Sequence, residues 1–174
     1  MQKTVYIFII ALAIHLIISP LVYAEYASEE KQTLPKVKAI DVFIVDPSIG
    51  NKSGLTEEQM RTDVELKLRL AGFTIEKTDL SVPYLHIVVT ALEITGDKTN
   101  RLIGIAWNAR VGFRQIVASK YQNQTFIAES WHRATLGTHA TYGNFRNAAR
   151  QVVKDFVDEF LNDYLSVHPI EKQE

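Results

Sequence analysis

Apolar and polar residues alternate with a period of two over 103–117, which is the clearest regular pattern in the chain. One set of alternate positions is apolar, and the other carries glycine, asparagine and arginine. Successive side chains of a strand point to opposite sides of a sheet, so the pattern predicts a strand with one face on a core and one in water. Asn108, Arg110 and Arg114 are therefore expected to share the wet face.

Four further strands are predicted around this one. The runs 37–45 and 84–94 are apolar at nearly every position, which is typical of strands buried on both faces. A short strand over 73–76 and a returning strand over 125–136 complete the set. The residues between them are turn formers, and we expect loops at 48–54 and 137–143.

Two helices are predicted, each with one apolar stripe. Thr56 and Gln59 form a capping box at the start of the first helix, and Gly72 lies where a left-handed C-terminal cap is needed. In the second helix apolar residues recur at steps of three and four from Phe145 to Leu165. Asn144 is expected to cap it, and Pro169 follows its end.

These elements predict a single α+β domain over 37–168 with the order β-α-β-β-β-β-α. Each helix has to bury one stripe, and the strand over 103–117 has to bury one face. The simplest arrangement is a two-layer sandwich, in which both helices pack on one face of a mixed, mostly antiparallel sheet. The opposite face of that sheet is then expected to be exposed or to meet a partner.

Residues 1–24 have the layout of a secretory signal peptide. Lys3 precedes an apolar run over 5–18, Ser19-Pro20 breaks any helix, and small residues lead to a cleavage site after Ala24. The rival interpretation is an uncleaved inner-membrane anchor, but the run has 14 residues where a spanning helix needs about 20. We expect an exported protein, periplasmic or secreted, with no membrane span after cleavage. Residues 25–36 are predicted to be a flexible leader and 169–174 a tail.

Composition excludes several classes of function. The chain has no cysteine, so disulfides, thiol catalysis, thiolate metal sites and lipidation at a cysteine are ruled out. Its 19 Lys and Arg residues against 20 Asp and Glu residues argue against a dedicated nucleic-acid binder, which usually carries a basic excess.

No motif predicts catalysis, a cofactor or a metal. The loop over 46–54 lacks the glycine spacing of a phosphate-binding loop, and His86, His132 and His139 fit no standard metal spacing. Glu129-Ser130-Trp131-His132 contains an acid, a hydroxyl and an imidazole. On a strand, however, Ser130 and His132 would point to one side and Glu129 to the other, so the three could not converge as a triad.

The wet face of the sheet is the remaining candidate for function, and its composition depends on the register of the 101–118/125–136 hairpin. A two- or four-residue turn places Ile127, Glu129, Trp131 and Arg133 beside the arginines, while a three- or five-residue turn presents Phe126, Ser130 and His132. In the first register Arg and Trp would lie together on an open surface, as they do in binding interfaces. The predicted partner-binding residues are Asn108, Arg110, Arg114 and Trp131.

The segment from Thr56-Glu-Glu-Gln59 to Glu65-Leu-Lys-Leu-Arg-Leu-Ala-Gly72-Phe73, with a strand on each side, resembles a group of small exported envelope domains. The group includes the amino-terminal domain of the Tol-system propeller protein and anticodon-binding-like domains of envelope lipoproteins and secretion rings. The resemblance covers the order of elements over about 37–165. It implies a periplasmic α+β binding or assembly module with no catalytic residues. The chain departs from the group in having no lipidated cysteine and no propeller.

The leading hypothesis is a non-catalytic exported module that binds a protein or another envelope component through an exposed sheet face or edge. The alternative is a small-ligand carrier or hydrolase with a cleft between sheet and helices, lined by His86 or His132. A third hypothesis is a homo-oligomer assembled by pairing of edge strands.

Overall fold

The computed structural model describes residues 32–45, 47, 49–77, 82–96, 100–121 and 124–169. The predicted signal peptide and its cleavage site after Ala24 lie outside the described residues. So do most of the leader and all of the tail beyond Pro169.

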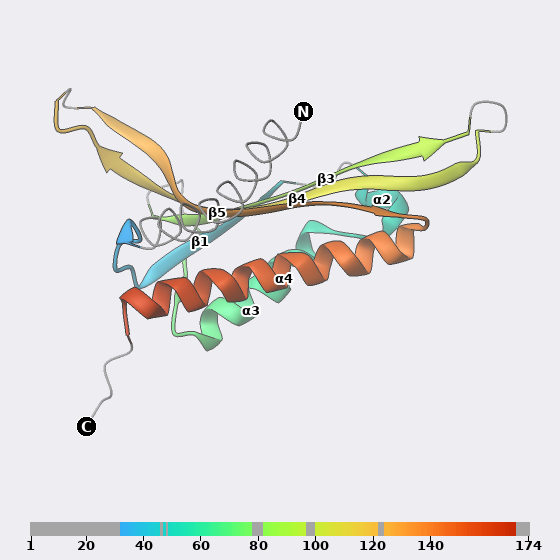
Figure 1. The fold of residues 1–174 in the computed structure, drawn as a ribbon. Coiled ribbons are helices and arrows are strands. Elements are labelled where there is room, and N and C mark those ends of the chain that lie inside the picture. The colour runs from blue at the N-terminus through green and yellow to red at the C-terminus, as the bar shows by residue number, and fades with distance from the viewer. Residues whose placement is uncertain are drawn as a thin grey trace, which may run out of the picture.

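The described chain forms one five-stranded sheet and two long helices (Figure 1). The strands are β1 (Ala39–Val45), β2 (Thr74–Ile75), β3 (Tyr84–Thr95), β4 (Leu102–Ala118) and β5 (Thr125–His139), in the spatial order β2-β1-β3-β4-β5. The helices are the single turn α2 (Gly50–Ser53), α3 (Glu57–Leu70) and α4 (Tyr142–Val167). Strand β1 is parallel to β2 and β3, whereas β3, β4 and β5 are antiparallel. The predicted α+β class and mixed sheet are confirmed.

Helices α3 and α4 lie side by side on the same face of the sheet (Figure 1). They are joined by a bidentate ion pair, in which Nε and Nη2 of Arg150 in α4 donate hydrogen bonds to the carboxylate of Asp63 in α3 at 2.7 to 3.0 Å. The helices are therefore one layer and the sheet is the other.

The ends of α3 follow the local signals in the sequence. The Thr56 hydroxyl accepts a hydrogen bond from the Gln59 N–H at 3.2 Å, which satisfies one of the free donors of the first turn. Gly72 has φ +90°, and the N–H groups of Gly72 and Phe73 donate to the carbonyls of Arg69 and Leu68. This is a Schellman motif, which needs a left-handed residue at that position.

The core fills the space between the two layers. The alternate residues of β4 that face the helices are all buried: Ile105, Trp107, Ala109, Val111 and Phe113. Phe160 of α4 packs against Phe113 and Trp131, each with a ring-centroid distance of 5.3 Å. The period of two thus identified the buried side of β4 correctly from Ile105 to Phe113, whereas Val117, of the same parity, is only half-buried. Ile103 has the same parity but is 63% exposed, because it lies near the end of the β3–β4 hairpin.

Three predicted boundaries were wrong. The loop expected over 137–143 is shorter, because β5 keeps pairing with β4 as far as His139 and Ile105. Helix α4 then begins at Tyr142, so its N-cap is Thr141 rather than Asn144, whose N–H donates to the Thr141 hydroxyl at 3.2 Å. The turn α2 forms within the loop expected over 48–54.

Candidate functional site

The face of the sheet turned away from α3 and α4 is not covered by either helix, and we call it the open face (Figure 1). Its side chains alternate with the buried ones along each strand. It contains large apolar residues with high exposure, namely Leu136 at 83%, Leu92 at 70% and Phe43 at 47%. Leu92 and Leu136 lie near each other across β4, and a group of exposed apolar side chains is typical of a binding surface.

A β-bulge decides which residues of β5 reach the open face. Phe113 pairs with Trp131, but the next residue of β4, Arg114, pairs with Glu129, so Ser130 is an extra residue in β5. The bulge reverses the alternation of β5. Glu129 and Ile127 therefore share the open face with Arg114, while on the other side of the bulge His132 and Leu136 share it with Arg110 and Asn108. Between the β4–β5 turn and the bulge, β5 has the first predicted register, with Ile127 and Glu129 on the open face. Beyond the bulge it has the second, with His132 on that face.

The prediction that Trp131 lies beside the arginines is wrong. Trp131 is on the helix-facing side of the sheet and is 1% exposed. Its indole N–H donates to the Asp163 carboxylate of α4 at 3.0 Å. The other three predicted residues, Asn108, Arg110 and Arg114, do lie on the open face, and their role in partner binding stays a prediction.

Glu129 is the centre of a group that we call the charged cluster, with Arg110 and Arg114. Its carboxylate pairs with Nη2 of Arg110 and accepts from Nε of Arg114 at 3.2 Å. The carboxylate lies across Gly112, where a Cβ would come within 2.8 Å of the Glu129 Cδ. The close approach of Glu129 to the sheet therefore requires a residue without a side chain at 112.

Two histidines flank the charged cluster. His86 of β3 and His132 of β5 are both in register with Gly112 of β4. The His86 ring stacks on Phe43 at 5.6 Å. Burial, and next the positive charge of Arg114, hold the pKa of His86 below its ordinary value of 6.5, against a smaller opposite effect of Glu129.

The pKa of His86 gives a testable consequence of this geometry. Because the folded-state pKa is lowered, the neutral ring is favoured, and the stability that His86 contributes is lost as pH falls below 6.5. Arg114→Gln removes a positive neighbour and should raise the pKa of His86. NMR titration of the His86 ring protons in both proteins measures this. An unchanged or lower pKa in Arg114→Gln would contradict the cluster geometry.

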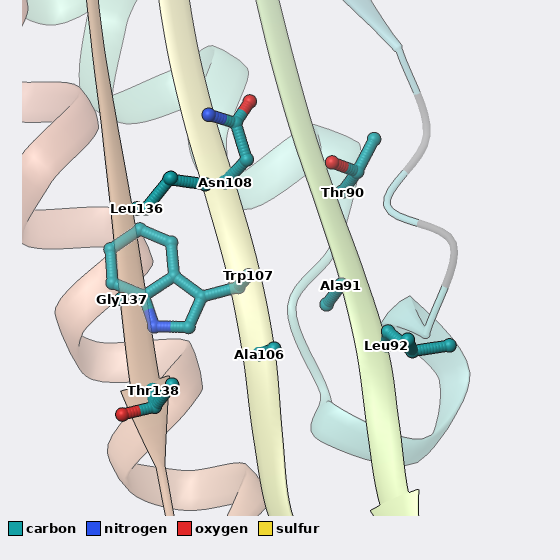
Figure 2. Close-up of a pocket in the computed structure, with 9 residues that line it drawn as sticks. All are labelled: Thr90, Ala91, Leu92, Ala106, Trp107, Asn108, Leu136, Gly137 and Thr138. Carbon is teal, nitrogen blue, oxygen red and sulfur yellow. The ribbon is translucent and has the colours of Figure 1, made fainter.

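A shallow groove of about 650 Å³ lies on the open face across β3, β4 and β5 (Figure 2). Six of its lining residues have open-face positions: Thr90, Leu92, Ala106, Asn108, Leu136 and Thr138. Its wall is mostly apolar, with the Asn108 amide as a polar group that donates to the Thr135 carbonyl at 2.9 Å. The groove adjoins the charged cluster, since Arg110 follows Asn108 on the same side of β4. Neither Leu92 nor Leu136 was predicted to belong to the site.

The prediction that Glu129 and His132 point to opposite sides is wrong, because the bulge places both on the open face, with 3.9 Å between a Glu129 carboxylate oxygen and Nδ1 of His132. Glu129, Ser130 and His132 still do not form a triad. The Ser130 hydroxyl makes no hydrogen bond to any described residue, so His132 is not placed as its base. Within the same part of the chain, no three His, Asp or Glu side chains are grouped so that they could hold a metal ion.

The small-ligand or hydrolase hypothesis expected a cleft between the sheet and the helices, lined by His86 or His132, and the structure does not place those histidines there. His86 and His132 lie on the open face, not between sheet and helices. The region between the layers contains the packed core. A second hollow of about 310 Å³ lies at one end of the layers, beside Gly72 and His168.

The fold and site define an α+β domain with a helical layer on one side and an open sheet face on the other. No described protein family and no curated relative matches the chain. Among solved structures it is similar to the rare lipoprotein B of Shewanella oneidensis, at 17% identity over 74% of this chain and 96% of that one, with a TM-score of 0.32. It is also similar to a minor lipoprotein of Acinetobacter baumannii (12% identity, 80% and 100% coverage, TM-score 0.41) and to lipoprotein GNA1162 of Neisseria meningitidis (11%, 72% and 99%, 0.34).

All three of these proteins are bacterial lipoproteins, the group to which part of the predicted resemblance pointed. Their TM-scores are all below 0.5. The resemblance to the Tol-system domain stays a prediction. In the part of the chain that the structure describes, no helix combines the length and the apolar character needed to cross a bilayer.

Proposed function

We propose that this chain is a non-catalytic exported module that binds a protein of the cell envelope through its open face. The observation that carries the proposal is that helices cover only one of the two faces of the sheet. Helices α3 and α4 bury one face, and the other face presents an apolar groove next to a charged cluster. Export is the expectation from residues 1–24.

The groove supports binding to a protein through apolar side chains. Leu92 and Leu136, on the β3 and β5 sides of the groove, are 70% and 83% exposed. Covering such a side chain with a partner contributes about 1.5–3 kcal/mol when its burial is complete. A groove of this shape is suited to one or two apolar side chains from a partner segment that lies across β3, β4 and β5.

The charged cluster supports selectivity for a partner with an acidic group. Arg110 and Arg114 carry two positive charges against the single negative charge of Glu129, so the cluster has a net charge of about +1. Their side chains are 43% and 31% exposed, which leaves them accessible to a partner. Arginine is enriched among the residues that contribute most to binding interfaces.

Substitution of Leu136 is the sharpest test. Leu136→Ser should weaken binding about tenfold, the effect of losing about 1.4 kcal/mol of apolar contact. Leu70→Ser is the matched control, because Leu70 is 79% exposed but lies on α3. Both variants should keep the melting temperature of the parent, since neither side chain is packed.

The partner is first identified by a photo-crosslinking residue at position 136, with the same residue at position 70 as the control. The purified partner is then titrated against the parent and the two serine variants. A dissociation constant that does not change in Leu136→Ser, or that changes equally in Leu70→Ser, would refute binding through the open face.

A further inference from the structure

The described end of the β4–β5 hairpin projects beyond the helices, on the opposite side of the molecule from the ends at which β3 leads into β4 (Figure 1). We call residues 115–121 and 124–128 the β4–β5 arm. Its strands stay paired from Gln115 and Ala128 to Ala118 and Thr125, and Ser119 donates to the Gln124 carbonyl at 2.7 Å. The arm is therefore a regular two-stranded ribbon.

Both faces of the arm present apolar side chains to solvent. Ile116 and Ile127 pair across the strands on one face, and each is 51% exposed. Val117 pairs with Phe126 on the other face, and Phe126 is 46% exposed although it lies on the side of the helices. Tyr121, near the turn, is 90% exposed. Among the residues that the structure describes, no packing contact explains why these four side chains are exposed.

The two-sided character of the arm distinguishes between classes of partner. A folded protein that packs against one face of a ribbon leaves the other face in water. A bilayer surrounds an inserted ribbon, so it removes Ile116, Phe126 and Ile127 from water together. Tyrosine is enriched at membrane interfaces, where its ring lies among apolar groups and its hydroxyl stays hydrated.

Charge in the arm fits a lipid surface. Lys120 is the only charged residue from Gln115 to Ala128, so no acidic side chain would be brought toward anionic headgroups. A lysine can also extend its apolar stem along lipid while its ammonium group stays in water. The end of the β3–β4 hairpin is different, because its sequence contains Glu93 and Asp97.

We propose that the β4–β5 arm inserts into the interfacial region of a lipid bilayer. Strand residues rise about 3.3 Å each, so the apolar part from Ile116 to Ala118 spans about 7 Å. This length matches the depth of about 5–10 Å to which interfacial segments penetrate. Three residues are far fewer than the about 9–11 that a membrane-spanning strand needs. In the described sheet, β4 pairs with β3 only as far as Arg114 and β5 is an edge strand, so the outer edges of the arm lie outside the β-ladder. Backbone groups outside a ladder need water, which restricts the arm to the hydrated interface.

A tryptophan at position 121 tests the insertion in the full chain. Trp107 and Trp131 are 6% and 1% exposed, so the added tryptophan in Tyr121→Trp can be resolved against a constant background. The probe is a vesicle of phosphatidylethanolamine and phosphatidylglycerol with brominated acyl chains. We expect a blue shift of the added emission and its quenching by bromine. Leu70→Trp, on α3, should show neither effect.

The design separates insertion of the arm from adsorption by another segment. Residues 5–18 form an apolar run that can by itself hold the full chain on vesicles. If the chain sediments with vesicles while the Tyr121→Trp emission stays as in buffer, the proposal is wrong. Equal quenching of Leu70→Trp would also overturn it. So would a photo-crosslinker at position 126 that forms adducts with protein and none with lipid.

A second substitution makes the test quantitative. Phe126→Asp in the Tyr121→Trp chain should lower partitioning into the vesicles at the arm about tenfold, the effect of losing one buried aromatic side chain. Lys120→Gln should weaken binding to the anionic vesicles about fivefold. Unchanged quenching in Phe126→Asp would contradict insertion.

The proposal of lipid binding by the arm and the proposal of protein binding by the open face can be refuted independently. Leu136→Ser should leave the quenching of Tyr121→Trp unchanged, and Phe126→Asp should leave the affinity for the protein partner unchanged. Loss of both activities in either variant would show that the two surfaces form one site, which contradicts the proposal of a separate lipid-binding arm.

Discussion

Replacing Trp131 by alanine is expected to lower the free energy of unfolding by about 3–5 kcal/mol, the range for a large aromatic residue removed from a core. Trp131 is 1% exposed and packs edge-on against Phe160 of α4 at a centroid distance of 5.3 Å. Its N–H donates to Asp163, which also accepts from Arg133 at 3.1 Å. The alanine variant would lose the ring packing and the hydrogen bond together.

Urea unfolding of the parent and the variant measures the effect of Trp131→Ala. Tyr121→Ala is the control, because it removes an aromatic ring that is 90% exposed and should change stability by no more than about 0.5 kcal/mol. If Trp131→Ala unfolds like the parent but loses its partner, Trp131 belongs to the interface, and the burial described above is wrong.

Gly137→Ala is expected to destabilise the protein by about 1–3 kcal/mol through overpacking. A Cβ at position 137 would lie 2.5 Å from Cε2 and 2.7 Å from Nε1 of Trp107. The indole of Trp107 is stacked on His139 at 6.0 Å and packs edge-on against Phe145 at 6.1 Å. A rigid ring with neighbours on both sides cannot move aside without shifting β5 or α4.

Gly143→Ala is the matched control for Gly137→Ala. Apart from its chain neighbours and the backbone of its own helix, no atom lies within 4 Å of a Cβ at Gly143, and alanine is the better helix former in the first turn of α4. Thermal unfolding should show a clear loss in Gly137→Ala and no loss in Gly143→Ala. An unchanged melting temperature in Gly137→Ala would mean that Trp107 does not lie against β5.

The layered arrangement could be predicted because its signals are local or strictly periodic. The alternation along β4 identifies the side of the sheet that faces the core. The apolar stripe of each helix must be buried against that same side. The capping motifs at Thr56 and Gly72 define the ends of α3 through hydrogen bonds between residues at most five positions apart. Such contacts depend little on the rest of the chain, so the sequence alone is sufficient to predict them.

The bulge at Ser130 could not be predicted, and it accounts for the error at Trp131. A bulge is a property of two paired strands, so the sequence of β5 alone does not show where it lies. The error in the predicted start of α4 also arises from strand pairing. Thr141 and Asn144 are both good N-caps, and the choice between them follows from the pairing of β5 with β4 as far as His139.

The charged cluster was only partly visible in the sequence. The shared face of Arg110 and Arg114 follows from the period of two, but the position of Glu129 depends on the bulge. Gly112 was assigned to the wet face without a role, and its role is apparent only when Glu129 lies across it. Leu92 and Leu136 were missed because strand periodicity alone does not show which positions the helices leave uncovered.

Thiol labelling tests the central claim, a sheet covered by its own helices on one face and by a partner on the other. The chain has no cysteine, so Leu136→Cys and Leu70→Cys each provide a single reactive thiol. In the purified protein both should react with a maleimide at similar rates, because both positions are highly exposed. In cells that make the protein, the account predicts that Leu136→Cys is protected while Leu70→Cys still reacts. Equal reactivity of the two thiols in those cells, or an unreactive Leu136→Cys in the purified protein, would contradict it.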